Sequence, residues 1–408
     1  VVQAKEEERQ GKNFDVFYKE GLNFESENGA FKIKIGGRIQ TDFGQLEPNK
    51  SLRQLGDDKG EDIQGHGAEM RRARLMAEGT IYENVEYKAE FDFAEGDVDF
   101  ADVYLGVKDI PYLGGIRVGH QKEPFSLEEQ TSTNYMTFME RGLPNAFSPV
   151  RNTGVKVFNT ALDSRMTWGV GAFEDTDNFG DAFANYSDYN VSGRITGLPW
   201  YEKEGRELVH LGLSYNHRFR AGDDNPVRFR TRPETHLTDL NTVDTGNMPA
   251  DGVDVINPEF ALVYGPFSLQ GEYFQTFVNA SGDSDLLDDP TFNGFYIYAS
   301  YFITGEHRAY KLSTGAFDRV KPFNNCSIKN CGWGAWEIAA RYSRIDLTDN
   351  DAGIRGGEEV NFTAGLNWYL NPNTRVMFNY VRANVDHRED LDGDGTLDVY
   401  ESRFMVDF

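Results

Sequence analysis

Arginine is concentrated in two short stretches of this 408-residue chain, at residues 71–74 ("RRAR") and 228–232 ("RFRTR"). Their arginines are Arg71, Arg72, Arg74, Arg228, Arg230 and Arg232. Alternate residues of an extended segment point to the same side, so the second stretch presents three guanidinium groups in a row. Guanidinium stays charged and binds oxyanions through paired hydrogen bonds, which makes such a row a path for phosphate-like solutes. The alternative is that each arginine pairs with a nearby carboxylate.

Residues 31–44, "FKIKIGGRIQTDFG", indicate which kind of element would position such arginines. The odd-numbered residues are mostly apolar, whereas the even-numbered residues include Lys34 and Arg38. This alternation predicts a strand with one apolar face and one polar face. Arg38 therefore lies on the polar face.

The same rule sorts the arginines of the first stretch. Arg72 and Arg74 share the polar parity of a second strand over 71–80. Arg71 has the other parity, so it must reach the polar face from a rim or a bulge, or point away from it.

The alternation recurs along the chain in segments of about ten residues, which is the signature of a transmembrane β-barrel. Counting these segments predicts an all-β, antiparallel barrel of about sixteen strands, which closes around an aqueous channel. The 30 Phe, 20 Tyr and 5 Trp suit the aromatic girdles at the two membrane interfaces. The residues expected to face lipid include Phe91, Leu105, Leu366 and Phe404.

The chain divides into a tail and a barrel. Residues 1–20, with the charge run "AKEEERQGK", are expected to form an N-terminal tail or periplasmic segment, and residues 21–408 to form the barrel. Long polar stretches at 44–67 and 219–254 alternate with short turns, as external loops alternate with periplasmic turns in such barrels. We expect some of these loops to fold into the lumen. A helical pattern occurs at 126–147.

Composition excludes several classes of protein. Asp and Glu number 66 against 41 Lys and Arg, and a net charge of −25 opposes binding to nucleic acid, which needs a basic surface. No run of about 18 apolar residues encodes a transmembrane helix. The chain opens without a charged-then-apolar leader, so we expect residue 1 to follow a removed signal peptide or to be a segment boundary. The seven His are scattered, and neither G-x-S-x-G nor H-E-x-x-H occurs, which argues against an enzyme.

Residues 390–401, "DLDGDGTLDVYE", fit the calcium-loop pattern D-x-D-x-D-G-x₅-E. Oxygen ligands at this spacing wrap around one hard cation. The flanking segments are strands rather than helices, and the alternative is an acidic external loop. The expected Ca²⁺ ligands are Asp390, Asp392, Asp394, Thr396 through its carbonyl group, Asp398 and Glu401.

Several motifs resemble the phosphate-selective porin O and P family of outer-membrane proteins. They are "FKIKIGGRIQTDFG", "RRARLMAEGTIYENVEYKAEFDF" (71–93), "GHQKEPFSLEE" (119–129), "RFRTRPE" (228–234), "GEHRAYKL" (305–312) and "LNWYLNPNTRVMFNYV" (366–381). They follow in the family's order through nearly the whole chain. The resemblance implies a trimeric outer-membrane porin of about sixteen strands whose inward arginines guide anions.

The resemblance also implies roles for single residues. Asp102 matches an acidic residue beside the family's constriction, where it would orient the arginines or repel a doubly charged anion. The residues that match the family's anion path are Arg38, Arg71, Arg72 and the arginines of 228–232, to which Arg74 adds by its parity. The residues that match its periplasmic-side lysines are Lys34, Lys311 and Lys321.

Glu129 departs from the family pattern. The phosphate-selective members of the family carry a lysine at this position, and the nearby Lys122 is a candidate substitute. A carboxylate there would oppose anion binding unless it is paired. The resemblance therefore supports a porin more strongly than it supports phosphate selectivity.

Cys326 and Cys331 are the only cysteines. Strand parity places their connection, residues 305–332, on the oxidising periplasmic side, which predicts a local disulfide. With no second pair of cysteines, we expect no zinc site.

We therefore expect a passive diffusion channel, with a weak to moderate preference for small anions, in the outer membrane of a Gram-negative-type bacterium. Its expected partners are two further copies in a homotrimer, membrane lipid, lipopolysaccharide and small anions, and Ca²⁺ is the expected cofactor. Two alternatives remain. One is a barrel plugged by its own loops that serves as a receptor or structural protein, and the other is a barrel enzyme.

Overall fold

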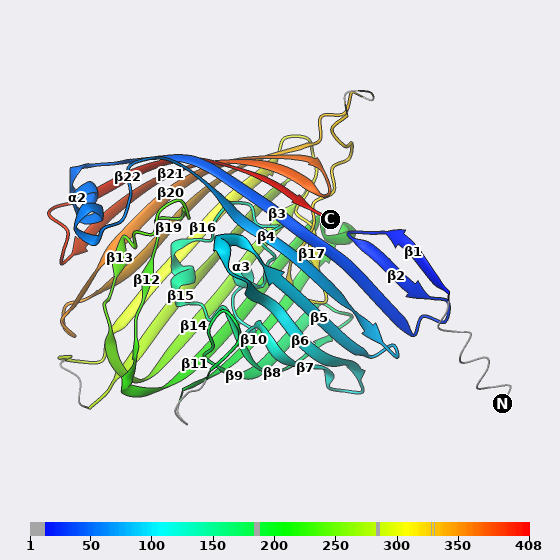
Figure 1. Ribbon diagram of the computed structural model, residues 1–408, viewed down its shortest axis with the longest axis horizontal. Coiled ribbons are helices and arrows are strands. Elements are labelled where there is room, and N and C mark those ends of the chain that lie inside the picture. Colours follow the sequence, from blue (N-terminus) through cyan, green and yellow to red (C-terminus); the bar gives the residue numbers. More distant parts are fainter. Residues whose placement is uncertain (1–12, 183–187, 283–285, 328, 330) are drawn as a thin grey trace.

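The computed structural model describes residues 13–182, 188–282, 286–327, 329 and 331–408. Sixteen antiparallel strands close into one barrel (Figure 1), which confirms the expected fold class. The barrel strands are β3 (Phe31–Pro48), β4 (Gly65–Ile81), β5 (Val85–Asp92), β6 (Asp99–Ile110), β7 (Gly114–Lys122), β8 (Arg151–Ala161), β9 (Met166–Glu174), β10 (Tyr189–Glu202), β11 (Glu207–Val227), β14 (Met248–Tyr264), β15 (Phe267–Ala280), β16 (Thr291–Phe302), β19 (Ala335–Asp349), β20 (Ile354–Asn371), β21 (Thr374–Arg388) and β22 (Gly395–Asp407).

The barrel closes at a seam between β22 and β3. The register pairs Phe404 with Thr41, and Asp407 with the predicted site residue Arg38. At the end of the seam, the backbone of Phe408 and that of Gly37 exchange hydrogen bonds of 2.7 and 3.0 Å. A Cβ atom on Gly37 would lie 2.4 Å from the carbonyl oxygen of Arg74, so this close approach requires glycine.

The two faces of the strands follow the alternation in the sequence. Inward Gln40 and Asp42 are buried, as the predicted polar face requires. All four residues expected to face lipid lie on the outward parity. Leu105 and Phe404 are 65% and 49% exposed, and Phe91 and Leu366 are half-buried among outward neighbours.

A hairpin of two further strands extends the sheet beyond the barrel at its N-terminal end (Figure 1). It consists of β1 (Phe14–Tyr18) and β2 (Leu22–Ser26), and β2 pairs with the start of β3. The predicted boundary at residue 20 falls between these two strands, and residues 1–12 of the predicted tail lie outside the described residues.

The two ends of the barrel differ in their connections. One end has short turns, for example at 111–113 and 265–266, and the other end has longer connections at 49–64, 123–150 and 228–247. The long loop predicted at 219–254 is shorter in the structure, because β11 extends to Val227 and β14 begins at Met248. The connection between these two strands is therefore 228–247. The helices are α2 (Lys50–Lys59), α3 (Leu127–Gln130), and the 3₁₀ turns η1 (Ala94–Gly96), η2 (Leu143–Phe147) and η3 (Lys203–Gly205). Among the described residues, none of these helices has the length and the apolar character needed to cross a membrane.

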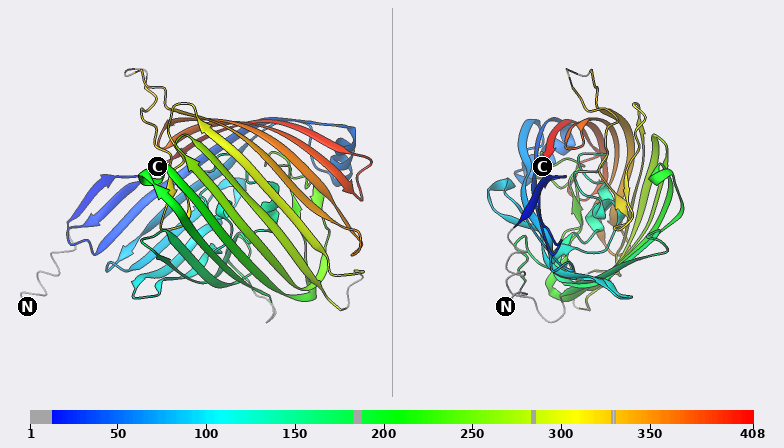
Figure 2. Two further views of the ribbon diagram at one scale, coloured as in Figure 1. Left: turned by 180° about the vertical axis from the view of Figure 1, so that it is seen from behind. Right: turned by 90° about the vertical axis from the view of Figure 1, so that its right-hand side faces the viewer.

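Three connections fold into the barrel, as Figure 2 shows in the view along its axis. Residues 123–150 and 228–247 enter from the end with the long connections, and residues 305–320 enter from the end with the short turns. The second connection carries the short pair β12 (Arg230–Thr231) and β13 (Val243–Asp244), and the third carries β17 (Tyr310–Lys311) and β18 (Ala316–Phe317).

The barrel wall is divided here into two sides. The side named the short wall runs from β3 to β9 and includes the three shortest barrel strands, β5, β7 and β9, with 8, 9 and 9 residues. The side named the long wall runs from β10 to β22 and includes β11 and β20, with 21 and 18 residues. On the inside of the long wall, near the external end, the inward residues are apolar rather than polar, and they pack against α2 and 228–247. This buried cluster includes Leu52, Phe229, Leu240, Val243, Val253, Val381, Val385, Leu397 and Val399.

Candidate functional site

The connection 123–150, named here the constriction loop, begins with firm anchors on the long wall. The backbone N–H groups of Leu127 and Glu128 donate to the carboxylate of Glu272 on β15 at 3.0 and 2.8 Å. The N–H group of Ser126 donates to the hydroxyl of Ser214 on β11 at 3.1 Å. These bonds fix the first turn of the loop inside the lumen.

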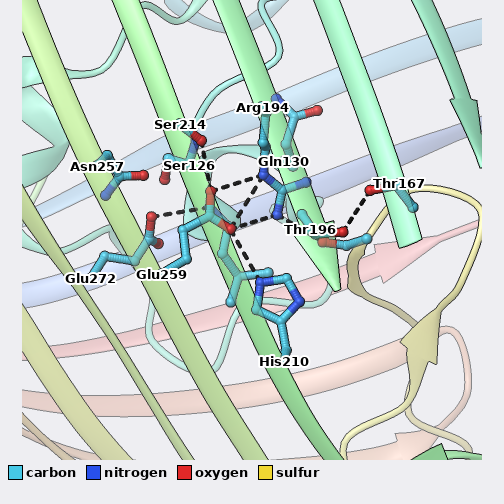
Figure 3. A network of polar contacts seen from close by, with 12 residues as sticks. Ser126, Gln130, Thr167, Arg194, Thr196, His210, Ser214, Asn257, Glu259 and Glu272 are labelled. Atoms are coloured by element: carbon cyan, nitrogen blue, oxygen red, sulfur yellow. Dashed lines mark hydrogen bonds and ion pairs between the residues drawn. The ribbon is translucent and has the colours of Figure 1, made fainter. Parts of the chain in front are cut away.

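Glu259 on β14 lies at the centre of the same network (Figure 3). Its carboxylate accepts hydrogen bonds from Arg194 and Ser214, both at 2.8 Å, and His210 lies 3.2 Å away. Arg194 also donates to the carbonyl oxygen of Gly315 at 2.8 Å. The network therefore holds two inner segments, the constriction loop and the segment around Gly315, against one wall.

Three buried arginines of the long wall, named here the loop-holding arginines, hold the rest of the constriction loop. Each donates to a backbone carbonyl oxygen of the loop, and each is at most 3% exposed. The bonds join Arg341 to Glu140 at 2.9 Å, Arg375 to Met136 at 2.7 Å, and Arg403 to Met139 at 2.5 Å. Arg341 also forms an ion pair with Glu234 of residues 228–247 at 2.6 Å.

Opposite the loop, the short wall carries a chain of ion pairs. Arg38 and Lys88 both contact Glu90 at 2.8 Å, and Lys88 also contacts Asp102 at 2.7 Å. Asp102 in turn binds Arg151 at 2.8 Å. Asp102 thus lies within this chain of ion pairs, where it contacts two cations.

Arg71 reaches the lumen through a β-bulge. The register of β3 and β4 passes from Gln40–Arg72 to Thr41–Met70, which leaves Arg71 without a partner in the ladder. Its guanidinium forms an ion pair with Glu140 of the constriction loop at 2.9 Å. The parity of Arg71 allowed a rim position, a bulge or an outward position, and the structure places Arg71 at a bulge.

The two neighbouring arginines differ in their surroundings. Arg74 forms an ion pair with Asp92 at 2.6 Å and lies 3.6 Å from Glu90. Arg72 is 5% exposed and donates to the side-chain oxygen of Gln40 at 2.8 Å, with no ion pair to any carboxylate in the described part of the chain. Arg72 therefore contributes a positive charge that no adjacent carboxylate neutralises.

Glu129 does not face the lumen as a free carboxylate. It is fully buried, with Lys122 at 3.3 Å and Arg141 at 3.2 Å. Burial favours the neutral acid, but Arg141 and Lys122 outweigh it and lower the pKa of Glu129 below its usual range. Lys122 is thus the partner of Glu129, and the expected opposition to anions is cancelled locally.

The charged side chains of the short wall and of the constriction loop form one group, named here the constriction cluster, which has an excess of positive charge. Eight cations face five carboxylates, and Glu90, Asp102, Glu129 and Glu140 each contact at least two cations. In a lumen with low-dielectric walls, such an excess attracts anions and repels cations. The members are Arg38, Arg71, Arg72, Arg74, Lys88, Lys122, Arg141, Arg151, Glu90, Asp92, Asp102, Glu129 and Glu140.

Open cavities lie on both sides of the cluster. A cavity of about 320 Å³ is lined by Arg71, Arg74 and Arg151. A second cavity of about 280 Å³ is lined by Arg38 and Lys88, and it also receives Lys34 and Lys311. The positive groups are therefore accessible from both ends of the barrel.

The predicted lysines at the end with the short turns are placed differently from one another. Lys34 forms an ion pair with Glu78 at 2.9 Å, and Lys311 is exposed to the cavity that both line. Lys321 is 69% exposed at the side chain and lies 3.8 Å from Glu20, outside this cavity.

The structure does not bring the arginines of 228–232 to the constriction. Arg228 forms an ion pair with Asp244, and Arg232 with Asp239, both within the same connection. Arg230 is exposed. In the described residues, none of the three has a hydrogen bond or ion pair with the constriction cluster, because the connection begins where β11 ends at the external rim.

The six expected Ca²⁺ ligands do not converge. Asp398 and Glu401 lie on opposite faces of β22, where Asp398 binds Arg382 and Glu401 accepts from Thr235 at 2.9 Å. The carboxylate of Asp390 is held by Arg388 and Lys59. Within the described ranges, no group of three or more His, Cys, Asp or Glu side chains is arranged to hold a metal ion. Binding of Ca²⁺ to the loop stays a prediction that calorimetry tests, and it would require the start of β22 to open.

The predicted disulfide is not formed in the structure, where Cys326 and Cys331 are both free. A β-bridge joins Ser327 and Gly332, so the two cysteines flank it at diagonal rather than directly opposed positions. Diagonal neighbours lie about 7–8 Å apart, farther than a disulfide spans.

The cluster contains residues that sequence reasoning did not select. Lys88 and Glu90 lie on the predicted polar face of β5, so the alternation rule was sufficient to find them. Arg151 begins β8 directly after the constriction loop, and Arg141 lies within that loop, where no periodicity applies.

A closed barrel with an apolar outer band, and with a lumen narrowed by inner loops and a charged cluster, is an outer-membrane porin. The chain belongs to the family described as phosphate-selective porin O and P, whose model matches residues 33–408. The protein is therefore located in the outer membrane of a Gram-negative bacterium.

Two relatives match along nearly the whole chain. Porin O of Pseudomonas aeruginosa is 27% identical over 433 residues, which cover 98% of this chain and 93% of that protein. An uncharacterized protein of Caulobacter vibrioides is 31% identical over 412 residues, which cover 97% of this chain and 77% of that protein.

Solved structures share the fold at low sequence identity. The trimer form of OmpT, an outer membrane protein of Vibrio cholerae, superimposes with a TM-score of 0.54 at 12% identity over 92% of this chain and 99% of that one. An anion-selective porin from Comamonas acidovorans gives a TM-score of 0.52 at 13% identity, again over 92% and 99%.

Proposed function

We propose that this porin passes small anions in preference to cations. The observation that carries the proposal is the sharing of carboxylates in the constriction cluster, where Glu90, Asp102, Glu129 and Glu140 each contact at least two cations. The net charge of −25 does not decide selectivity, because permeation depends on the charge at the narrowest point. The description of the family as phosphate-selective porins and the name of the anion-selective porin from Comamonas acidovorans support the same direction.

The cluster favours transit over tight binding of phosphate-like oxyanions. Except for Arg72, its arginines already form ion pairs with carboxylates, so an incoming oxyanion must compete with those carboxylates. The exchange of one anionic partner for another gains little net free energy. The preference is therefore weak to moderate, without tight block by phosphate.

We further propose that three copies associate through the short wall, since OmpT of Vibrio cholerae has a trimer form. Several outward residues of β6 to β9 are aliphatic and exposed, whereas the long wall is rich in Phe and Tyr, as expected of a surface that meets lipid and lipopolysaccharide. The exposed aliphatic residues include Leu105, Val118, Val155 and Val170, at 65, 53, 46 and 46%. A charge introduced at Val118 should convert trimers to monomers in size-exclusion chromatography.

Planar-bilayer recordings of the purified protein test the channel proposal. We expect discrete conductance steps, and a reversal potential across a KCl gradient that indicates preference for Cl⁻. A silent membrane would favour the alternative of a barrel plugged by its loops. Steps with a preference for K⁺ would overturn the proposed role of the cluster.

A further inference from the structure

A separate cavity lies between the inner face of the short wall and residues 311–314, on the side of the short turns. Its volume is about 510 Å³. It shares Lys311 with the cavity beneath Arg38, so a solute that leaves the constriction toward the short turns can enter it. Its charged and aromatic lining consists of Lys108, Arg117, Lys156, Arg194, Lys311, Glu86 and Phe158, together with Trp168 at its edge.

Five basic residues and one carboxylate line this cavity, and three of the basic residues form no ion pair in the part of the chain that the structure describes. Lys156 is 92% buried, and among the described residues its side-chain nitrogen has a single hydrogen-bond partner, the carbonyl oxygen of Lys122 at 3.0 Å. Within the described residues, neither Lys156, Lys108 nor Lys311 has an ion pair. A buried amine without a counter-charge tends to lose its proton, and an anion that enters beside Lys156 stabilises the charged form of this side chain.

An aromatic surface adjoins these ammonium groups. The guanidinium of Arg117 lies between the rings of Tyr104 and Phe158, 4.6 Å from each centroid, and forms an ion pair with Glu86 at 2.6 Å. A Cβ atom on Gly115 would lie 2.6 Å from Cζ of Phe158, so glycine makes the room that the ring occupies. These contacts hold the half-buried Phe158 in place beside the cavity.

We propose that this cavity binds organic anions that combine a flat apolar ring with one carboxylate or phosphate group. The ring packs on Phe158, and the anionic group binds Lys156 and Lys311. Acetate and inorganic phosphate have no ring, so they can bind Lys156 and Lys311 but cannot pack on Phe158. The inference rests on the proposed function, since it names the class of anion for which this route has a binding site.

Block of single-channel current tests this proposal. Benzoate and acetate, added in turn on the side of the short turns, carry the same charge and differ in the ring. We expect benzoate to half-block the current at about a tenth of the acetate concentration, as burial of one aromatic face allows. Phe158→Leu should reduce this ratio to about two, because it removes most of the flat surface while it keeps an apolar side chain.

Two further variants make the test specific. Lys156→Met should weaken block by both anions by a similar factor, since it removes the charge and keeps the length of the side chain. Phe378→Leu removes an outward ring on the long wall and should leave the ratio unchanged. Retention of the folded band in unheated gel samples confirms that each variant is a closed barrel.

The outcomes separate the two proposals. Equal block by benzoate and acetate in an anion-selective wild-type channel overturns the inference and leaves the proposed function intact. A benzoate preference that survives Phe158→Leu also overturns it. A silent or cation-selective channel contradicts the proposed function itself.

Discussion

Both walls of the lumen carry inward arginines, but these arginines have different partners. On the long wall, Arg341, Arg375 and Arg403 are buried and donate to backbone carbonyl oxygens of the constriction loop. On the short wall, Arg38 and Arg74 share carboxylates and line open cavities. An arginine in a porin is therefore a structural or a conducting residue according to what holds its guanidinium, and its position on the polar face does not decide between the two.

The largest expected effect is on stability, and it comes from removing one of the loop-holding arginines of the long wall. Arg341→Ala leaves the buried carboxylate of Glu234 without its guanidinium partner, which should cost about 3–5 kcal/mol in the free energy of unfolding. The constriction loop also loses the anchor at the Glu140 carbonyl oxygen. Unfolding in guanidinium chloride, followed by tryptophan fluorescence in detergent, measures the loss.

The double variant Arg341→Met with Glu234→Gln is the matched control. It removes both charges together, so most of the stability should return. If Arg341→Ala alone unfolds at the wild-type denaturant concentration, Arg341 does not hold the loop, and the comparison of the two walls fails.

On the conducting side, the double variant Arg38→Gln with Arg74→Gln should change selectivity and leave stability nearly intact. Glu90 keeps Lys88, and Asp92 keeps the N–H groups of Ala73 and Ala94, so neither carboxylate is left without a partner. The Cl⁻/K⁺ permeability ratio should fall by roughly threefold to tenfold, since each lost charge is partly screened. Reversal potentials measure this ratio, and an unchanged ratio would remove both residues from the anion path.

A smaller and opposite change is expected for Glu129→Gln. The variant removes one negative charge and leaves Lys122 and Arg141 without their shared partner, so the Cl⁻/K⁺ ratio should rise by about twofold. Glu204→Gln, on an exposed short turn, is the control with the same change of charge. A fall in the ratio would mean that Glu129 acts only by holding the loop.

The smallest effect is the response to mild acid. Arg141 and Lys122 lower the pKa of Glu129 against the effect of burial, and Arg71 and Arg403 do the same for Glu140. Both carboxylates therefore stay ionised below the pH at which an ordinary Glu is protonated. Protonation of Glu129 and Glu140 should therefore add nothing to the Cl⁻/K⁺ ratio until the pH falls below the range in which an ordinary Glu is protonated. The wild type and Glu129→Gln should then show parallel pH profiles of this ratio between pH 7 and 5, and profiles that converge in this range would contradict the pairing.

Sequence reasoning predicted the barrel well because its signal is local. The alternation in 31–44 defined the faces of β3, and the outward residues Leu105 and Phe404 followed from the same rule. The rule failed on the inside of the long wall near the external rim. There, inward residues such as Val385 and Leu397 are apolar, because α2 and 228–247 cover them and exclude water.

The site was predicted only where strands supply it. The alternation of faces along a strand was sufficient to place Arg38, Arg74 and Asp102 on the inward face. It also allowed a bulge as one of the positions of Arg71. It could not locate Arg141, whose position depends on how the constriction loop folds across the lumen. The prediction that the arginines of 228–232 lie at the constriction was wrong for a related reason. The spacing of these residues shows that they share one side of an extended segment, but it does not show how far into the barrel the segment reaches.

The seam between β3 and β22 has a consequence for how the channel assembles. Eleven residue pairs join these strands, which stand at opposite ends of the barrel sequence. The entropy of closing so long a chain grows only slowly with its length. An open edge in hydrocarbon, by contrast, leaves a row of backbone groups without partners, at several kcal/mol each. A barrel with an open seam is therefore unstable in the bilayer, because its edge strands keep unpaired backbone groups. We expect insertion into the membrane and closure of the seam to occur together, as one cooperative step.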